Sequence, residues 1–268
     1  IFFSTEELDA RASAKFGLGE QILMENAAGR IEREIRKRLK KGSHILALCG
    51  GGNNGADAMA ALRKLSGDFS CTALCVLQNR SAAGKFQADA ARAAGVRLID
   101  IASAKDDCGH VEGASSKDAC VHESAGYGGE CGRPSVLRDE ITSADCIIDG
   151  VFGSGLNKAL SSEICEILSL ANSAKSLKIA VDIPSGIDKS GRVLGGAFCA
   201  DLTIAMGALK LALFSDGAKD YVGQIKVANL GISRSNFERG SEYFLLQKSD
   251  LKLPLRRKQN TNKGDFGH

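Results

Sequence analysis

Three glycine-containing segments follow apolar runs, and each carries a carboxylate near its glycines. The three segments are residues 50–57, 149–155 and 182–188. Acids such as Asp149 and Asp182 at strand ends can divide proton donation and acceptance, or bind a hard cation together with amide and hydroxyl oxygens. The alternative is that each aspartate caps a helix or closes its own turn. Three such loops at one sheet edge favour a shared site, and the lack of histidine in them argues against a histidine base or a transition-metal centre.

The first loop has the composition of a nucleotide-binding turn. Gly50, Gly52 and Gly55 let the backbone turn tightly and approach a ligand, and the next helix offers free N–H groups to an anion. This spacing satisfies G-x-G-x-x-G, but residues 77–80 supply no acid about 20 residues further on, where a ribose partner is expected. The loop also lacks the Lys-Ser/Thr pair of a Walker A motif. We interpret it as a generic strand-turn-helix nucleotide site, with an NAD(P) oxidoreductase as an alternative.

Composition places the chain among ordinary globular proteins. The 268 residues are 44% hydrophobic and 25% charged, and the formal net charge is +3. This charge favours neither nucleic acid nor a membrane surface as a partner, and no apolar run approaches the roughly 20 residues of a membrane span. Nine scattered cysteines, several inside apolar runs, indicate a reducing cytoplasm. We expect a few residues to precede Ile1.

Apolar periodicity alternates between strand and helix and predicts one α/β domain with a doubly wound, mostly parallel sheet. Two helices are expected first, with apolar stripes over residues 8–16 and 22–39. We then expect strands at 45–49, 70–77, 96–99, 145–149 and 178–182, helices at 57–66, 83–94 and 159–172, and further strands at 202–206, 211–214, 224–228 and 243–246, some of them antiparallel at an edge.

Two segments leave alternatives open. A basic cluster at 30–41 suits either RNA or a solvated helix face, and we favour the solvated face because cations complement a helix C-terminus. The stretch 103–133 has neither helical nor strand periodicity. It contains potential zinc ligands whose spacing matches no established zinc pattern, so we favour a flexible surface excursion. These ligands are Cys108, His110, Cys120, His122 and Cys131.

The same motifs carry a family resemblance. They are residues 24–27 (Met-Glu-Asn-Ala), 52–57, 149–155 and 182–188, followed by Thr203, Gly207, Lys210 and residues 221–223. Together they resemble the YjeF N-terminal domain family, the NAD(P)H-hydrate epimerases, over roughly residues 4–246. The resemblance implies a three-layer Rossmann-like domain, usually homodimeric, that interconverts the R and S forms of NADHX and NADPHX. These are damaged cofactors with water added at C6 of the nicotinamide ring.

The resemblance also implies which residues form the site. Asn54, Asp149 and Ser185 would bind a potassium ion. The hydrate would be lined by Asn53, Asn54, Gly55, Ala56, Asp57, Gly153, Ser154, Gly155, Leu156, Asn157, Lys158, Ala159 and Asp182. Loss of the C6 hydroxyl as water, or opening of the ring, gives a planar centre that can close from either face, and a positioned acid and base speed both directions. Our hypothesis gives this work mainly to Asp182, with Lys85 as a possible partner.

The chain departs from the family pattern at two positions, and its last residues resemble the start of a second domain. Ala56 and Ala58 stand where the family usually has glycine, at a helix start that tolerates a methyl group. Residues 1–250 are interpreted as the epimerase domain and 251–268 as a linker with the truncated start of an ADP-dependent NAD(P)H-hydrate dehydratase domain. That second enzyme is therefore expected as a fused or separate partner. The main alternative is a non-catalytic module of the same fold that binds nucleotide or RNA.

Overall fold

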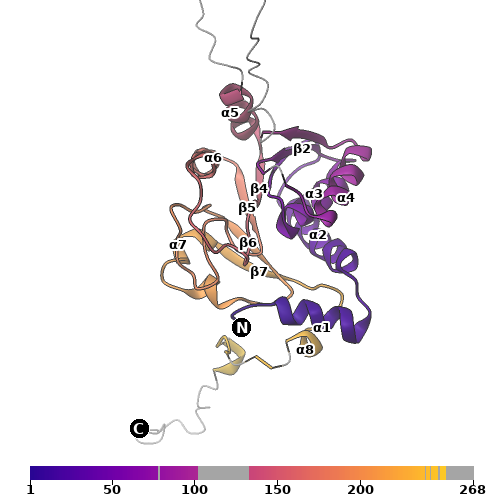
Figure 1. Ribbon diagram of the computed structural model, residues 1–268, viewed down its shortest axis with the longest axis vertical. Coiled ribbons are helices and arrows are strands. Elements are labelled where there is room, and N and C mark those ends of the chain that lie inside the picture. The colour runs from indigo at the N-terminus through magenta and orange to yellow at the C-terminus, as the bar shows by residue number, and fades with distance from the viewer. Residues whose placement is uncertain (78, 102–132, 239, 242, 247, 252–268) are drawn as a thin grey trace, which may run out of the picture.

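The computed structural model describes residues 1–77, 79–101, 133–238, 240–241, 243–246 and 248–251 (Figure 1). Within them, seven parallel strands form one sheet in the order β3-β2-β1-β4-β5-β6-β7. The strands are β1 (His44–Cys49), β2 (Ser70–Cys75), β3 (Arg97–Asp100), β4 (Cys146–Gly150), β5 (Leu177–Val181), β6 (Leu202–Met206) and β7 (Gln224–Ala228). The strand order reverses at β1, which pairs with both β2 and β4. This reversal defines a doubly wound sheet.

Helices cover both faces of the sheet. Figure 1 shows α2, α3 and α4 on one side and α6 and α7 on the other, with α5 at the top of the view. The helices of the described residues are α1 (Glu6–Phe16), α2 (Glu20–Arg36), α3 (Asn53–Leu65), α4 (Ala82–Ala93), α5 (Arg133–Ser143), α6 (Ser162–Ser173), α7 (Lys219–Val222) and α8 (Arg234–Phe237), with short 3₁₀ turns η2 (Leu211–Phe214) and η3 (Lys248–Asp250). The predicted three-layer, Rossmann-like architecture is confirmed.

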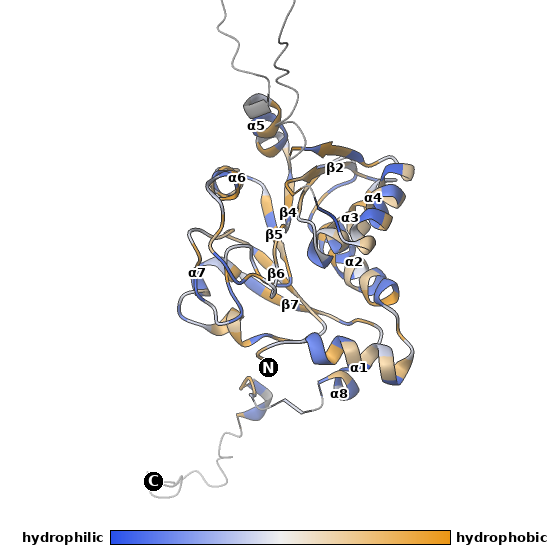
Figure 2. Ribbon diagram, viewed as in Figure 1, coloured by the Kyte–Doolittle hydropathy of each residue, from blue (hydrophilic) through white to orange (hydrophobic). Residues whose placement is uncertain are grey.

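Two apolar cores hold these layers together, one on each face of the sheet. Ile31 of α2 and Met59 of α3 are buried on one face, whereas Ile141 of α5 and Leu168 of α6 are buried on the other. The central strands are covered on both faces, which explains why they are nearly continuous apolar runs rather than alternating ones. Figure 2 shows hydrophobic residues along β4 and β5 and mixed character on the outer helices. Burial of this apolar surface is the main contribution to stability.

Two predicted strands were wrong. Residues 211–214 form η2, in which Ala212 and Leu213 are buried against a third apolar cluster. Apolar content alone does not distinguish a short strand from a short buried helix. Residues 243–246 have no regular secondary structure, and the carbonyl of Tyr243 accepts a hydrogen bond from the N-terminal amine of Ile1 instead of joining the sheet. The predicted antiparallel edge is also absent from the described residues, since β7 pairs parallel with β6.

Other boundaries moved by a few residues. Helix α3 begins at Asn53 rather than 57 because Gly52, in an extended conformation, is its N-cap, so Asn53 and Asn54 lie in the first helical turn. Helix α6 begins at Ser162 rather than 159, after the Ser161 hydroxyl accepts a hydrogen bond from the Ile164 amide. Helix α5 was not predicted. No helix in the described part of the chain combines the length and apolar character needed to cross a membrane.

Candidate functional site

A cavity of about 390 Å³ lies where the carboxyl ends of the central strands meet α1 and α2. Its position agrees with the general rule that open α/β sheets bind ligands beyond the carboxyl ends of their strands. It is lined by Thr5, Glu6, Asp9, Ser13, Glu20, Leu23, Met24, Ala27, Asn53, Asn54, Asp57, Ser154, Asp182, Met206 and Leu230. Residues from all three predicted loops therefore meet in one place.

Five of the predicted site residues line this cavity. They are Asn53, Asn54, Asp57, Ser154 and Asp182. The asparagines and Asp57 belong to the first two turns of α3, and Ser154 belongs to the loop after β4. Asp182 is the residue that directly follows β5. Asp149 belongs to the same region but lies beneath the cavity wall, where its side chain is fully buried.

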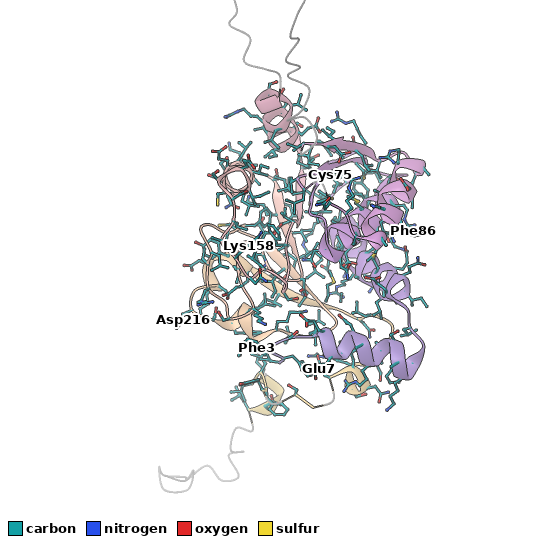
Figure 3. All side chains as sticks on the ribbon, in the orientation of Figure 1. Phe3, Glu7, Cys75, Phe86, Lys158 and Asp216 are labelled. Atoms are coloured by element: carbon teal, nitrogen blue, oxygen red, sulfur yellow. The ribbon has the colours of Figure 1, made fainter. Side chains whose placement is uncertain are left out.

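The other predicted residues lie elsewhere. Gly55 and Ala56 are buried within α3, and Gly55 packs so closely on Gly50 that a Cβ atom there would lie 2.2 Å from the Gly50 carbonyl oxygen. The remaining loop residues do not line the cavity, although Leu156 is buried. These residues are Gly153, Gly155, Leu156, Asn157, Lys158 and Ala159. Lys158, labelled in Figure 3, is exposed. Lys85 is exposed on α4 and is not placed with Asp182.

Asp182 is held by a buried amine and by an unusual backbone conformation. Its φ angle of 70° is the only positive value of a non-glycine residue in the described chain. Such strained positions concentrate at functional sites. Its Oδ1 accepts a hydrogen bond from the Met206 amide at 3.1 Å and lies 2.5 Å from Lys210 Nζ. Among the described residues both contacts are to Oδ1, so Oδ2 remains for a ligand.

Lys210 takes the place beside Asp182 that the sequence interpretation gave to Lys85. Its side chain is 1% exposed, and its Nζ also donates to the Met206 carbonyl at 2.9 Å. The N-terminal segment fixes its backbone, because the Phe2 amide donates to the Leu209 carbonyl and the Leu211 amide donates to the Phe2 carbonyl, each at 2.8 Å. In the sequence, Lys210 was identified only as part of the family pattern. Its contact with Asp182 could not be predicted because it depends on the pairing of β5 with β6.

Of the three residues predicted to bind potassium, Asn54 and Ser185 contact the backbone of Phe152, and Asp149 contacts Ser185. Asn54 Nδ2 donates to the carbonyls of Phe152 at 3.1 Å and Val181 at 2.8 Å. Ser185 Oγ accepts from the Phe152 amide at 2.8 Å and donates to Asp149 Oδ1 at 2.6 Å. Asp149 Oδ2 accepts from the Ser185 amide at 2.7 Å. A carboxylate, a hydroxyl and two backbone carbonyls thus lie together here, with the Asn54 Nδ2 donating to both carbonyls.

Three carboxyl groups of this region, those of Asp57, Asp9 and Asp149, have raised pKa values, chiefly because of desolvation. Burial raises the pKa of Asp57 well above its usual range, and Asp182, Asp9 and Glu20 raise it further, whereas Lys210 opposes the shift. Desolvation by the surrounding cavity wall raises the pKa of Asp9 to about 6, although the residue is exposed. Burial raises the pKa of Asp149 to about 6 against the opposing hydrogen bonds from Ser185 and Val151. Perturbed acids in a cavity are typical of functional sites.

Sequence reasoning missed the part of the cavity that α1 and α2 contribute. Glu6, Asp9 and Ser13 lie on one side of α1, at spacings of three and four residues, and Glu20 begins α2. The signal was present as a polar stripe at helical spacing. It was overlooked because an exposed polar face of an amphipathic helix has the same pattern.

Comparison with known proteins decides the family. The family described as YjeF-related protein N-terminus matches residues 20–212. The chain belongs to this family. The predicted YjeF resemblance is therefore confirmed, and the matched residues include the α3 loop, Asp149, Asp182 and Lys210 of the YjeF domain. Helix α1, which forms one wall of the cavity, precedes the matched segment.

Named relatives of this YjeF chain fall into two groups. "Bifunctional NAD(P)H-hydrate repair enzyme Nnr" of Helicobacter pylori is 40% identical over 268 residues, which is 100% of this chain and 50% of that protein. The chain thus spans about half the length of such relatives. "NAD(P)H-hydrate epimerase" of Rhodopirellula baltica is 28% identical over 84% of this chain and 81% of that protein. The crystal structure of yeast YNL200c aligns with a TM-score of 0.56 at 19% identity, covering 82% of this chain and 83% of that one, and supports the fold alone.

Proposed function

We propose that the chain catalyses interconversion of the R and S forms of hydrated NADH and NADPH, as an isomerase of nicotinamide nucleotide repair. The names of its relatives, NAD(P)H-hydrate epimerase and bifunctional NAD(P)H-hydrate repair enzyme, agree with this activity. The proposal depends on Asp182, which is paired with the buried Lys210 and lines a cavity together with Asp57 and the asparagines of α3. A scaffold protein has no need of such a group of ionisable side chains.

The charge of the cavity suggests which part of the substrate it receives. Five lining residues are acids, namely Glu6, Asp9, Glu20, Asp57 and Asp182, and the buried ammonium of Lys210 is already paired. Such a lining repels phosphates but accepts hydrogen bonds from ribose hydroxyls, a carboxamide and the hydroxyl at C6. We therefore assign the hydrated nicotinamide and its ribose to the cavity. In this assignment Asp182 Oδ2 exchanges a proton at the C6 hydroxyl while Lys210 holds Oδ1.

We propose potassium as the cation of the Asp149 cluster. The Asp149 carboxylate, the Ser185 hydroxyl and the Phe152 carbonyl form a hard donor set, and the fully buried carboxylate of Asp149 needs a compensating charge. Asn54 now donates through Nδ2 to the Phe152 carbonyl, so its amide group has to turn over to offer Oδ1 to the ion. These residues therefore fit a monovalent cation. The ion, when bound, supplies positive charge that keeps Asp149 ionised and holds the loop after β4 against the start of α3.

Further partners follow from the relatives and from the family resemblance. From the family resemblance we propose an ADP-dependent dehydratase as the second enzyme of the repair, fused to this domain or separate from it, and the word bifunctional in the names of the relatives agrees with a second activity. A cytoplasmic homodimer remains our expectation from the family.

The predicted zinc ligands, the segment 102–132 and the dehydratase-like residues 252–268 lie outside the described residues.

The RNA-binding alternative finds less support in the basic cluster at 30–41. Most of its cations are paired within the domain, since Arg30 and Arg38 contact Glu34 and Arg36 contacts Asp68. Cations neutralised in this way contribute little to phosphate binding. We therefore expect only weak RNA binding that is lost at moderate salt.

A coupled assay tests the proposed activity. A dehydratase that consumes only the S form is mixed with the R form of NADHX, with and without the purified chain. We expect the chain to accelerate disappearance of the R form above its unaided epimerisation. Unchanged consumption, or salt-dependent RNA binding in its place, would refute the proposal in favour of a binding module. Hydride transfer to a nicotinamide cofactor would instead indicate an oxidoreductase.

A further inference from the structure

Helix α1 forms a wall of the cavity although it precedes the family-matched segment. Thr5, Glu6, Asp9 and Ser13 all line the cavity. The segment before this helix is tied to the protein on both sides of Lys210, because Phe2 pairs with Leu209 and Leu211 through the backbone. Figure 1 shows α1 at the bottom of the view, below α2 and β7. The helix therefore lies at a fixed position relative to the amine that holds Asp182.

Asp9 is the member of this wall whose charge is coupled to the Asp182–Lys210 pair. Lys210 favours its ionised form, whereas Asp182 and Glu6 disfavour it. Asp9 in turn disfavours ionisation of Asp57 on α3. The charged and titratable groups around Asp9 are Glu6 on α1, Glu20 on α2, Asp57 on α3, Asp182 after β5 and Lys210 after β6. Asp9 thus shares one electrostatic environment with the proposed catalytic acid but approaches it from another element.

Epimerisation at a single carbon makes a particular demand on the site. The hydroxyl leaves from one face of the nicotinamide ring, and water returns to the other face. An enzyme that works in both directions needs a proton-transfer group on each side of the ring. Asp182 directly follows β5 at the edge of the sheet and Asp9 belongs to α1, so the two carboxyl groups line the cavity from different elements.

We propose that Asp9 is the second catalytic residue of the epimerisation, exchanging a proton with the C6 oxygen from the wall formed by α1, while Asp182 does so from the sheet edge. This inference rests on the proposed function. A pKa of about 6, raised chiefly by desolvation although the residue is exposed at the cavity wall, supports it because both protonation states of Asp9 are then populated near neutral pH.

The step balances without a redox partner. The Asp9 carboxyl gives its proton to the C6 hydroxyl oxygen, the C6–O bond breaks with both electrons on oxygen, and water forms as the N1 lone pair makes a C6=N1 bond. Water then attacks C6 from the other face, the C=N electron pair returns to N1, and the surplus proton passes to Asp182 Oδ2. One proton has moved from Asp9 to Asp182. The opposite epimer reacts by the reverse transfer, and solvent exchange resets the pair.

Asp9→Asn and Glu7→Gln form a matched test. Both substitutions remove one negative charge from the first turn of α1, but only Asp9 lines the cavity (Figure 3 labels Glu7). Epimerisation is followed with the S-specific dehydratase from pH 5 to 8, with binding of NADP⁺ and thermal unfolding measured in parallel. We expect Asp9→Asn to lower kcat about 100-fold at nearly unchanged KM, the size typical of general acid–base catalysis. The wild-type inflection near pH 6 should be absent from its profile and retained in Glu7→Gln.

Other outcomes separate this inference from the proposed function. An inactive wild-type chain would refute the proposed function itself. An active wild type with an equally active Asp9→Asn variant, or a variant changed only in KM, would overturn the catalytic role of Asp9. If Asp9→Asn unfolds, Asp9→Glu provides the test, because a carboxyl on a longer side chain should restore the pH 6 inflection at reduced kcat. Loss of that inflection in folded Asp9→Glu would also overturn the role.

Discussion

Lys210 Nζ lies 2.5 Å from Asp182 Oδ1, and the two side chains are only 1% and 7% exposed. The pair joins the turn after β5 to the turn after β6, at the edge of the sheet where the cavity opens. Removing one partner of a buried ion pair leaves an uncompensated charge, which is far more costly than losing a surface pair. The pair therefore positions the proposed catalytic carboxylate and also stabilises the fold.

Replacing this amine should destabilise the protein strongly. For Lys210→Met we expect the free energy of unfolding to fall by about 3–5 kcal/mol, because Asp182 would remain buried without a cation. Urea denaturation measures the change. Lys219→Met is the control, since Lys219 pairs with Asp216 on the exposed surface and its loss should change little. Equal stability of the two variants would contradict a structural role for the buried pair.

Two glycines of the loop after β4 should respond differently to alanine. A Cβ atom at Gly153 would lie 2.4 Å from Asn54 Nδ2, whereas one at Gly155 would meet nothing within 4 Å. Gly153→Ala should therefore displace the Asn54 side chain, costing about 1–3 kcal/mol as other overpacked sites do, and should also lower epimerisation. Gly155→Ala should resemble the wild type in thermal unfolding and activity. Similar behaviour of both variants would show that Asn54 is not fixed by this loop.

Potassium should stabilise the folded chain. A cation at ten times its dissociation constant adds about 1.4 kcal/mol, which corresponds to a Tm increase of about 3–6 °C for a protein of this size. Thermal unfolding in potassium chloride is compared with N-methylglucamine chloride at equal ionic strength. The increase should be lost in Ser185→Ala, which removes the hydroxyl that contacts Asp149. An identical Tm in both salts for the wild type would argue against a cation at this cluster.

Asp57 should make stability depend on pH. Its pKa is raised in the folded state, chiefly by burial, so the folded chain holds a proton that the unfolded chain releases above about pH 4. The free energy of unfolding contributed by this group therefore falls as pH rises from about 4. Asp57→Asn has no ionisable group here, so this decrease in the free energy of unfolding should be absent from the variant. Measured by urea denaturation, the variant should be more stable than the wild type at pH 8 and similar to it at pH 4. If the difference in free energy of unfolding between the variant and the wild type became smaller toward pH 8, Asp57 would be ionised in the folded protein.

Part of this site could be predicted from the sequence because its chemistry is local. Asp149 and Asp182 each end an apolar run before a glycine or proline turn, and in a parallel sheet such ends share one edge. The contact of Asp182 with Lys210 could not be predicted, because 28 residues and the pairing of β5 with β6 separate them. Asp9 was overlooked because only the packing of α1 distinguishes a cavity wall from a solvated helix face.

The fold shows the same division between local and tertiary information. Buried central strands were predictable as continuous apolar runs, whereas 211–214 and 243–246 have similar composition and form no strand. For 211–214 the deciding factor is tertiary, since Ala212 and Leu213 are buried in the apolar cluster that also contains Ile183 and Val222. The helix start at Asn53 depends on the conformation of Gly52, which composition alone does not specify.

Asp182 is the proposed reacting acid of a cavity that binds the hydrated nicotinamide. The most direct measurement is the epimerisation rate of Asp182→Asn, taken together with the affinity of the same preparation for NADPHX. The account predicts a loss of about 10²–10⁴-fold in kcat with affinity for the dinucleotide retained. An Asp182→Asn variant that binds NADPHX and epimerises it at the wild-type rate would contradict the account.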